Sequence, residues 1–375
     1  MNFGFTDEQE LLRAEVRKFL DQNASLEEVR SQCESDEGFD RKLWLQMAEL
    51  GFVGLTLPEQ HGGAGLDLVT LLVLLEETGR TLLPSPLIST VIASQAIQRF
   101  GDDEQRARWL PGLADGSRIG TLALLEQSDD LAPAGLCLQG KADGDETILT
   151  GRKLFVPDAG KADLFVVAFR SGSEPGDVGL AVLERSMAGV STSDAAAMDL
   201  TKRLGSLELD DVRVGPAGLL RPEGSAWSAV QSLIDLGAAL VTAETVGAAE
   251  GALAITTAFA KEREQFGSKI GRYQGVKHPL AEMYVDIESY KSLVYYAFWA
   301  LDEGEEGAAL AVSRAKAYAS ETFPMAGING VQLHGGVGYT WEYDIQLYLK
   351  RGKWMRPMYG DADYHYDRIA ELGGL

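Results

Sequence analysis

The sequence predicts an α+β protein in which helical first and last parts flank a β-rich middle part. Apolar residues recur at helical spacing before residue 117 and again after residue 223. Between these parts, short apolar or alternating segments are separated by glycine and aspartate turns. A chain of 375 residues is long enough for two or three domains. We therefore predict three domains, at 1–117, 118–222 and 223–375.

The first domain is expected to be helical. Thr6, followed by acids and Gln9, is typical of a capped helix start. The next helix is expected from Phe39 to Leu50, where Gly51 would end it. Further helices are predicted at 68–78, 87–100 and 103–113.

The middle domain is expected to be an antiparallel β-barrel or sandwich. Asp143-Gly144 and residues 171–173 are turn signals between short candidate strands. Short strands with regular turns are typical of antiparallel β-domains. The candidate strands are 119–125, 134–141, 147–156, 164–169, 179–184 and 206–214. From Trp227 onward helical periodicity returns, which predicts a helical bundle as the last domain.

Composition limits the classes of partner. Lys and Arg total 34 and Asp and Glu total 56, so the formal net charge is −22. This charge disfavours nucleic acid and anionic membranes as partners, although a local arginine can still bind an anionic ligand. Cys33 and Cys137 predict neither a disulfide framework nor a metal site, and the cytoplasm is the expected compartment. No membrane span is expected, because Asp235, Glu244 and Glu250 interrupt the longest apolar stretch.

The most informative segment, Lys-Glu-Arg-Glu-Gln-Phe-Gly, covers residues 261–267 at the end of a small-residue helix expected over 227–260. An arginine and a phenylalanine at a helix end, here Arg263 and Phe266, can grip a dinucleotide. The arginine would bind pyrophosphate oxygens, and the phenylalanine would pack against a ring. Gln274 follows shortly after this segment.

Another glycine-containing segment lies near the C-terminus, where Gln332 precedes the pair Gly335-Gly336. A glutamine offers an amide to phosphate or adenine, and adjacent glycines let the backbone approach a ligand closely. In this order and spacing, the two segments resemble the acyl-CoA dehydrogenase family of flavoproteins. The resemblance covers nearly the whole chain, and it implies the same three-part fold, ending in a four-helix bundle.

The resemblance implies an FAD cofactor that neighbouring subunits hold together. It also implies an acyl-CoA substrate, an electron-transfer flavoprotein as acceptor, and a homotetramer or an α2β2 heterotetramer. The positions that match the family's FAD contacts are Arg263, Phe266, Gln274, Gln332, Gly335 and Gly336.

Both positions that carry the catalytic base in relatives hold glycine here. Relatives place a glutamate after a tyrosine near the C-terminus, where this chain has Gly360, or early in the long helix, where it has Gly237. Glu244 lies on the same expected apolar stripe as Gly237, about two turns further on. Desolvation would raise its pKa, which suits a base for a weakly acidic α-proton. Glu244 is therefore the predicted base; the alternative is a buried ion pair, for example with Lys261 or Arg356.

Asp361 is the second choice for the base. It lies one residue beyond the family's C-terminal glutamate position, and a relative, nitroalkane oxidase, uses an aspartate in this region. The alternative is that Asp361 and Asp363 cap or begin the next helix, where acids are favoured.

The middle domain departs from the family pattern. Relatives carry Thr-Glu-Pro-Gly-Ala-Gly-Ser-Asp around the flavin ring, whereas residues 125–130 read Leu-Glu-Gln-Ser-Asp-Asp. Relatives carry Trp-Ile-Thr on the next wall, whereas this chain has Phe155-Val156-Pro157. Two interpretations follow: a self-sufficient dehydrogenase, or a non-catalytic subunit that completes a partner's FAD site. A flavoenzyme with different chemistry is a further alternative.

The two glycines also suggest a substrate class. Gly237 and Gly360 would leave space in the acyl pocket for a branched or ring-bearing group, as in heteromeric relatives that act on sterol side chains. This expectation requires that Tyr359, Trp354 or Met358 does not fill the space.

Overall fold

The computed structural model describes residues 4–375, which form two compact units. One unit contains the chain up to Glu34, Asp67–Pro84 and Gly237–Leu375, and the other contains Ser35–Leu66 and Ser85–Leu236. This division groups the first helices with the C-terminal ones. The three-domain boundaries drawn from the sequence remain a prediction.

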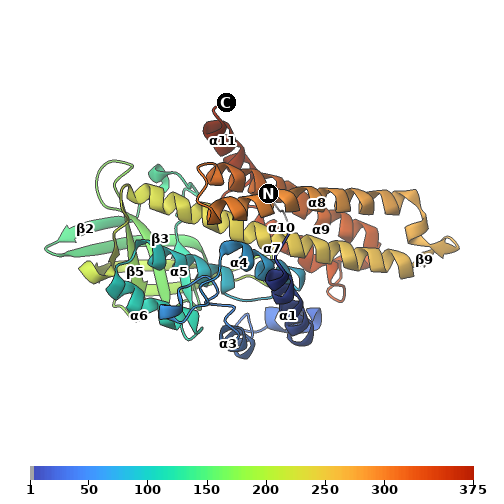
Figure 1. The fold of residues 1–375 in the computed structure, drawn as a ribbon, viewed down its shortest axis with the longest axis horizontal. Helices are drawn as coiled ribbons and strands as arrows, with labels where there is room; N and C mark the ends of the chain where they lie inside the picture. The colour runs from blue at the N-terminus through green and yellow to red at the C-terminus, as the bar shows by residue number, and fades with distance from the viewer. Residues whose placement is uncertain (1–3) are drawn as a thin grey trace. The chain divides into compact units, whose positions relative to one another are not determined.

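The first unit is helical (Figure 1). The predicted first helix is α1, and its Thr6 cap forms a capping box with Gln9. Helix α2 was not predicted, although Ser25 and Glu28 form the same kind of capping box at its start. The helices are α1 (Asp7–Asn23), α2 (Leu26–Cys33), α4 (Leu68–Arg80), most of α7 (Ala226–Glu262), α8 (Gln274–Asp302), α9 (Ala308–His334), α10 (Ile345–Met355) and α11 (Ala362–Gly373).

Helices α7 to α10 form the predicted bundle. The Tyr290 hydroxyl of α8 donates to the carbonyl of Thr245 in α7 at 2.8 Å. Gly327 of α9 packs directly on the backbone of Leu349 in α10. Small residues at such crossings let the helices approach closely, which explains the small-residue character of this part of the sequence.

The second unit combines helices with one sheet. Its helices are α3 (Arg41–Glu49), α5 (Leu87–Phe100) and α6 (Asp103–Ala114). The strands are β1 (Gly120–Ala123), β2 (Gln139–Asp143), β3 (Glu146–Pro157), β4 (Leu164–Arg170), β5 (Val178–Glu184), β6 (Val190–Ala195), β7 (Leu204–Val214) and β8 (Leu219–Leu220). They follow the order β6-β7-β3-β2-β4-β5-β8, and β1 pairs with β4.

The sheet differs from the prediction in three details. It is an open sheet rather than a closed barrel, because its order runs from β6 at one end to β8 at the other. It is mainly antiparallel, but β4 pairs in parallel with both β1 and β2. Strands β6 and β8 were missed, and residues 134–138, expected in a strand, contribute to the short 3₁₀ turn Pro133–Gly135 and the segment after it.

Helix α7 is long and apolar enough to cross a membrane by length and composition, which the sequence reading did not expect. However, 78% of its most apolar window is buried inside the protein. Its apolar residues are thus used in packing, as in the core helix of a globular protein.

Candidate functional site

A β-hairpin follows α7 (Figure 1). The pairing of its strands places the predicted Phe266 in the turn. Strand β9 (Glu264–Gln265) pairs with β10 (Ser268–Lys269), so the turn has only two residues. Both have positive φ, 54° at Phe266 and 76° at Gly267, as a type I′ turn requires. Positive φ is unfavourable for a bulky residue, and the Phe266 side chain is 92% exposed. An aromatic ring held in solvent on a strained turn indicates a binding role.

A hollow of about 690 Å³ lies beside this hairpin. It brings together five of the six residues predicted to contact the cofactor. The sixth residue, Gln274, does not line the hollow. It is the first residue of α8, and the next residue, Gly275, does line the hollow. The lining residues are Phe259, Arg263, Gln265, Phe266, Ile270, Tyr273, Gly275, Val276, Gln332, Leu333, His334, Gly335, Gly336 and Val337.

The electrostatics of the hollow suit an anion. Within residues 4–375, the Arg263 guanidinium forms no hydrogen bond or ion pair. The nearby acid Glu264 is neutralised by Lys269, with 2.8 Å between their charged atoms. Apart from the adjoining residues of the chain, no described atom lies within 4 Å of where a Cβ would stand on Gly335 or Gly336. An anionic dinucleotide could therefore approach both the free cation and the bare backbone.

His334 forms part of the wall of the hollow. Its ring stacks on Phe259 with 4.2 Å between centroids, and its Nδ1 lies 2.8 Å from the carbonyl oxygen of Gly330. Burial lowers the pKa of His334, which favours the neutral ring. His334 and Phe259 thus form a flat surface on which a ligand ring could pack. No cluster of metal-ligating residues is found in the described chain.

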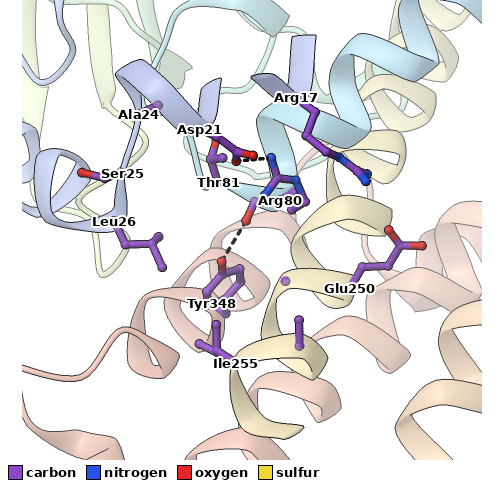
Figure 2. A pocket seen from close by; sticks show the side chains of 12 residues that line it. Arg17, Asp21, Ala24, Ser25, Leu26, Arg80, Thr81, Glu250, Ile255 and Tyr348 are labelled. Carbon is purple, nitrogen blue, oxygen red and sulfur yellow. Dashed lines mark hydrogen bonds and ion pairs between the residues drawn. The ribbon is translucent and has the colours of Figure 1, made fainter. Parts of the chain in front are cut away.

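Another hollow, of about 390 Å³, has a different character (Figure 2). Arg80 pairs with Asp21 at 2.7 Å and with Glu77 at 2.9 Å, and Tyr348 donates to the Arg80 carbonyl. Arg17 also pairs with Glu77. Because its arginines are already neutralised by the protein, this hollow is a weaker candidate for an anionic ligand than the one at Arg263.

The two glycine positions do not leave open space, which corrects the expectation of room for a bulky acyl group. A Cβ on Gly237 would meet the Tyr359 ring at 2.5 Å, and Tyr359 is only 7% exposed. A Cβ on Gly360 would meet the Tyr364 ring at 2.2 Å. Tyrosine rings therefore occupy the volumes that the sequence assigned to substrate.

Glu244 forms a buried ion pair, which was the alternative to its predicted role as the base. Its Oε2 lies 3.1 Å from Nη1 of Arg351, and both side chains are buried. The partner is neither Lys261, which is exposed, nor Arg356, which pairs with Glu321. A buried carboxylate in such a pair is held by a fixed charge.

Asp361 is the N-cap of α11. Its Oδ1 accepts a hydrogen bond from the backbone N–H of Tyr364 at 3.0 Å. Asp363 lies in the first turn of the same helix. Both acids therefore lie at the start of a helix, which was the predicted alternative to a catalytic role for Asp361.

Two buried side chains that the sequence reading did not assign lie beside Asp361. Lys316 of α9 is fully buried, and its Nζ donates to carbonyl oxygens of the loop between α10 and α11. His365 is also fully buried against that loop. A signal for Lys316 existed, because it shares a helical face with the buried residues Val312, Ala319 and Phe323.

In the second unit, the segment that replaces the family's glycine-rich stretch is closed by an internal ion pair. Glu126 pairs with fully buried Lys153 at 2.6 Å and accepts hydrogen bonds from the backbone of Cys137 and Leu138. The following Asp129 and Asp130 are exposed. This segment presents acids and no glycine, so it does not offer the close backbone approach expected around a flavin ring.

Comparisons with known proteins point to one family. Family models for the N-terminal and C-terminal domains of acyl-CoA dehydrogenases match residues 6–117 and 224–373. Acyl-CoA dehydrogenase IpdE2 of Mycolicibacterium smegmatis is 32% identical over 92% of either chain.

Solved structures show the same likeness. A variant of the steroid ACAD Tcur3481-Tcur3483 is 34% identical over 98% of either chain, with a TM-score of 0.89. The ChsE4-ChsE5 complex of Mycobacterium tuberculosis is 26% identical over 100% of this chain and 99% of its own, with a TM-score of 0.91.

Proposed function

The chain belongs to the acyl-CoA dehydrogenase family of FAD-dependent oxidoreductases, and from this premise we propose that its hairpin hollow holds the ADP half of an FAD. The observation that carries the proposal is the unpaired Arg263 beside the exposed Phe266 and the bare backbone of Gly335 and Gly336. Arg263 would bind pyrophosphate, and Phe266 would cover a ring. Gln332 and Gln274 would supply amides at the rim.

Removing the cation tests this proposal. We expect Arg263→Ala to weaken FAD binding about 10- to 100-fold, because a charge-assisted hydrogen bond contributes about 1.5–3 kcal/mol. Phe266→Ala should weaken it as well. Both effects can be measured by titrating FAD into the flavin-free protein and following flavin fluorescence. Arg272→Ala is the matched control, since Arg272 is exposed nearby but does not line the hollow. Equal affinities of the Arg263 and Arg272 variants would refute the assignment.

For the reaction, we propose α,β-dehydrogenation of an acyl-CoA thioester. FAD, when bound, supplies the hydride acceptor at the β-carbon. A protein carboxylate must take the α-proton. Within this chain Glu244 remains our first proposal for that role, by its place on α7, and Asp361 our second.

A second candidate function is that the chain completes the FAD site of a partner subunit, which supplies the base. Several contacts support it. Glu244 is engaged by Arg351, Asp361 caps α11, and a tyrosine ring lies over Gly237. The acidic segment at 125–130 also supports this second candidate, because it has no glycine that would let the backbone approach a flavin ring. The solved ChsE4-ChsE5 relative is described as a complex.

Carboxylate-to-amide variants distinguish the two candidates. If Glu244 is the base, Glu244→Gln should lower kcat by ~10²–10⁴-fold while FAD content stays constant. Asp361→Asn tests the second choice in the same way. If the chain only completes a partner's site, both variants of the co-purified assembly should keep turnover within a few-fold of wild type. Steady-state rates with an acyl-CoA panel and an artificial electron acceptor provide the measurement.

We propose further that an electron-transfer flavoprotein accepts the electrons, that the chain works as a homotetramer or an α2β2 heterotetramer in the cytoplasm, and that it binds no nucleic acid. Family membership supports the acceptor and the tetramer. The net charge of −22 supports the exclusion of nucleic acid.

A further inference from the structure

The β9–β10 hairpin is too short to hold its shape by strand pairing. Its register joins two residues of β9 to two residues of β10, and even a longer isolated hairpin is only marginally stable in water. The Glu264–Lys269 ion pair fastens its base. The Ile270 N–H also donates to the Arg263 carbonyl there, at 2.9 Å. Both contacts lie at the end of the hairpin away from the turn.

The turn itself carries a residue that its geometry disfavours. A type I′ turn favours asparagine, aspartate or glycine at its first central position, because these residues tolerate positive φ. Phe266 occupies that position here, with φ 54° and an exposed ring. A broken local rule with no gain in packing marks a position selected for function. The ring of Phe266, and not the stability of the turn, therefore explains the choice of residue.

Tyr273 supports the turn from outside the hairpin. Its hydroxyl donates to the carbonyl oxygens of Gln265 and Phe266, each 3.2 Å away. Its ring also meets the Phe266 ring edge to face, with 6.3 Å between centroids. Tyr273 directly precedes α8, so a bundle helix anchors it. One side chain thus contacts both the backbone and the aromatic ring of the turn.

These contacts lie beside the hollow that holds the unpaired Arg263. Tyr273 and Phe266 both line it. Because the Tyr273 hydroxyl proton is already used by protein carbonyls, its role differs from that of a free ligand-binding donor. Holding a loop in its binding conformation raises affinity, since less entropy is lost when the ligand binds.

We propose that Tyr273 is a positioning residue: its hydroxyl holds the turn so that the Phe266 ring stands beside the hollow before a dinucleotide binds. The inference rests on the proposed FAD site. It adds a residue that raises cofactor affinity by acting through Phe266.

The first test measures cofactor affinity. The protein, with its partner subunit if one co-purifies, is stripped of flavin and titrated with FAD while flavin fluorescence is recorded. Tyr273→Phe removes the hydroxyl but keeps the ring, and it should weaken FAD binding about 2- to 10-fold, the range of one net hydrogen bond. Tyr366→Phe is the matched control at an exposed tyrosine of α11, and it should bind FAD as wild type does.

Variants of the turn separate positioning from direct contact with the cofactor. In the Phe266→Ala background, Tyr273→Phe should change FAD affinity less than about 2-fold, because its effect passes through the ring. Phe266→Asn should order the turn better and still lose FAD affinity as Phe266→Ala does. Losses that add in the double variant would show that Tyr273 binds the cofactor itself, and the positioning role would be wrong.

Hydrogen exchange provides a readout that needs no flavin. In the flavin-free protein, Tyr273→Phe should speed amide exchange in residues 263–270 several-fold and leave the rest of the chain unchanged. Phe266→Asn should slow exchange in the same residues. Unchanged exchange in Tyr273→Phe would overturn the inference, and so would faster exchange throughout the helical bundle, since Tyr273 would then be only structural.

The outcomes distinguish this inference from the proposed function. If the wild-type protein binds no FAD, or if Arg263→Ala and Phe266→Ala bind it equally well, the proposed FAD site and this inference both fall. If those two variants lose affinity while Tyr273→Phe retains it, the FAD site stands and only the role of Tyr273 is wrong.

Discussion

At the scale of single residues, buried charges show how this fold uses ionic groups. Glu244 is paired with Arg351, Lys153 with Glu126, and Lys316 donates to loop carbonyls. Each group has partners because an isolated charge in an apolar interior is costly. Arg263 contrasts with them, since no described residue engages its guanidinium and it lines an open hollow. An unmatched cation is thus a better sign of a ligand here than a buried carboxylate.

Burial lowers the pKa of Lys316 to about 7. The nearby Asp361 carboxylate raises this pKa, and the nearby Arg356 cation lowers it further. His365 lies near enough to interact electrostatically with Lys316, and burial keeps the His365 ring neutral. Between pH 7 and about 10.5, the unfolded chain therefore binds a proton that the folded chain lacks, and stability rises with pH. We expect the unfolding free energy of wild type minus that of Lys316→Met to increase from pH 7 to pH 9, by at most about 1.4 kcal/mol per pH unit.

Urea denaturation of both proteins at the two pH values gives this difference. Lys153, whose pKa burial lowers to about 8, is present in both proteins and cancels. A difference that is flat, or that falls with pH, would show that Lys316 stays charged in the folded state.

At the scale of elements, α4 and α7 cross with their backbones in contact. A Cβ on Gly247 of α7 would come within 1.7 Å of the Glu76 carbonyl oxygen, and one on Gly79 of α4 within 1.8 Å of the Glu244 carbonyl oxygen. Such glycines are required by close approach rather than by a positive φ. The crossing fixes the segment of α7 that carries Glu244.

Gly247→Ala should therefore destabilise the protein by at least about 2 kcal/mol, because neither helix backbone can move without disturbing the core. Gly275→Ala is the control, since Gly275 is also helical but has open space around it, and it should be neutral or stabilising. Thermal unfolding midpoints compare the two. Similar unfolding midpoints for the Gly247 and Gly275 variants would mean that α4 and α7 can move apart at little cost in free energy.

At the scale of the whole molecule, the proposed FAD hollow is open to solvent. Phe266, Gln332, Gly335 and Gly336 are all exposed. A dinucleotide bound only here would remain largely hydrated, so we propose that a neighbouring subunit covers it, as the family resemblance implies.

We accordingly expect flavin release and dissociation of the assembly to occur over the same range of protein concentration. Flavin fluorescence and sedimentation velocity, each recorded across a dilution series, provide the two curves. Flavin that stays bound to isolated single chains would contradict a shared site.

The sequence by itself determined the fold class and the approximate bounds of α3 to α7, because these depend on local information, whereas the cofactor residues remain a proposal. Helical periodicity, capping boxes and the short Arg263–Phe266 segment are each readable within a few residues. The gathering of Arg263, Phe266, Gln332 and the glycine pair into one hollow agrees with the family resemblance.

Only the tertiary structure decided how each isolated signal is used. The sequence placed Glu244 on a buried face, but its Arg351 partner is more than a hundred residues away in the chain. Gly237 suggested empty space, yet the Tyr359 ring fills it from a distant loop. Strand β6 and the open edge of the sheet were missed for the same reason, since pairing and closure depend on long-range contacts. Whether a buried group has a partner or a cavity is a property of packing between distant segments, which local pattern does not encode.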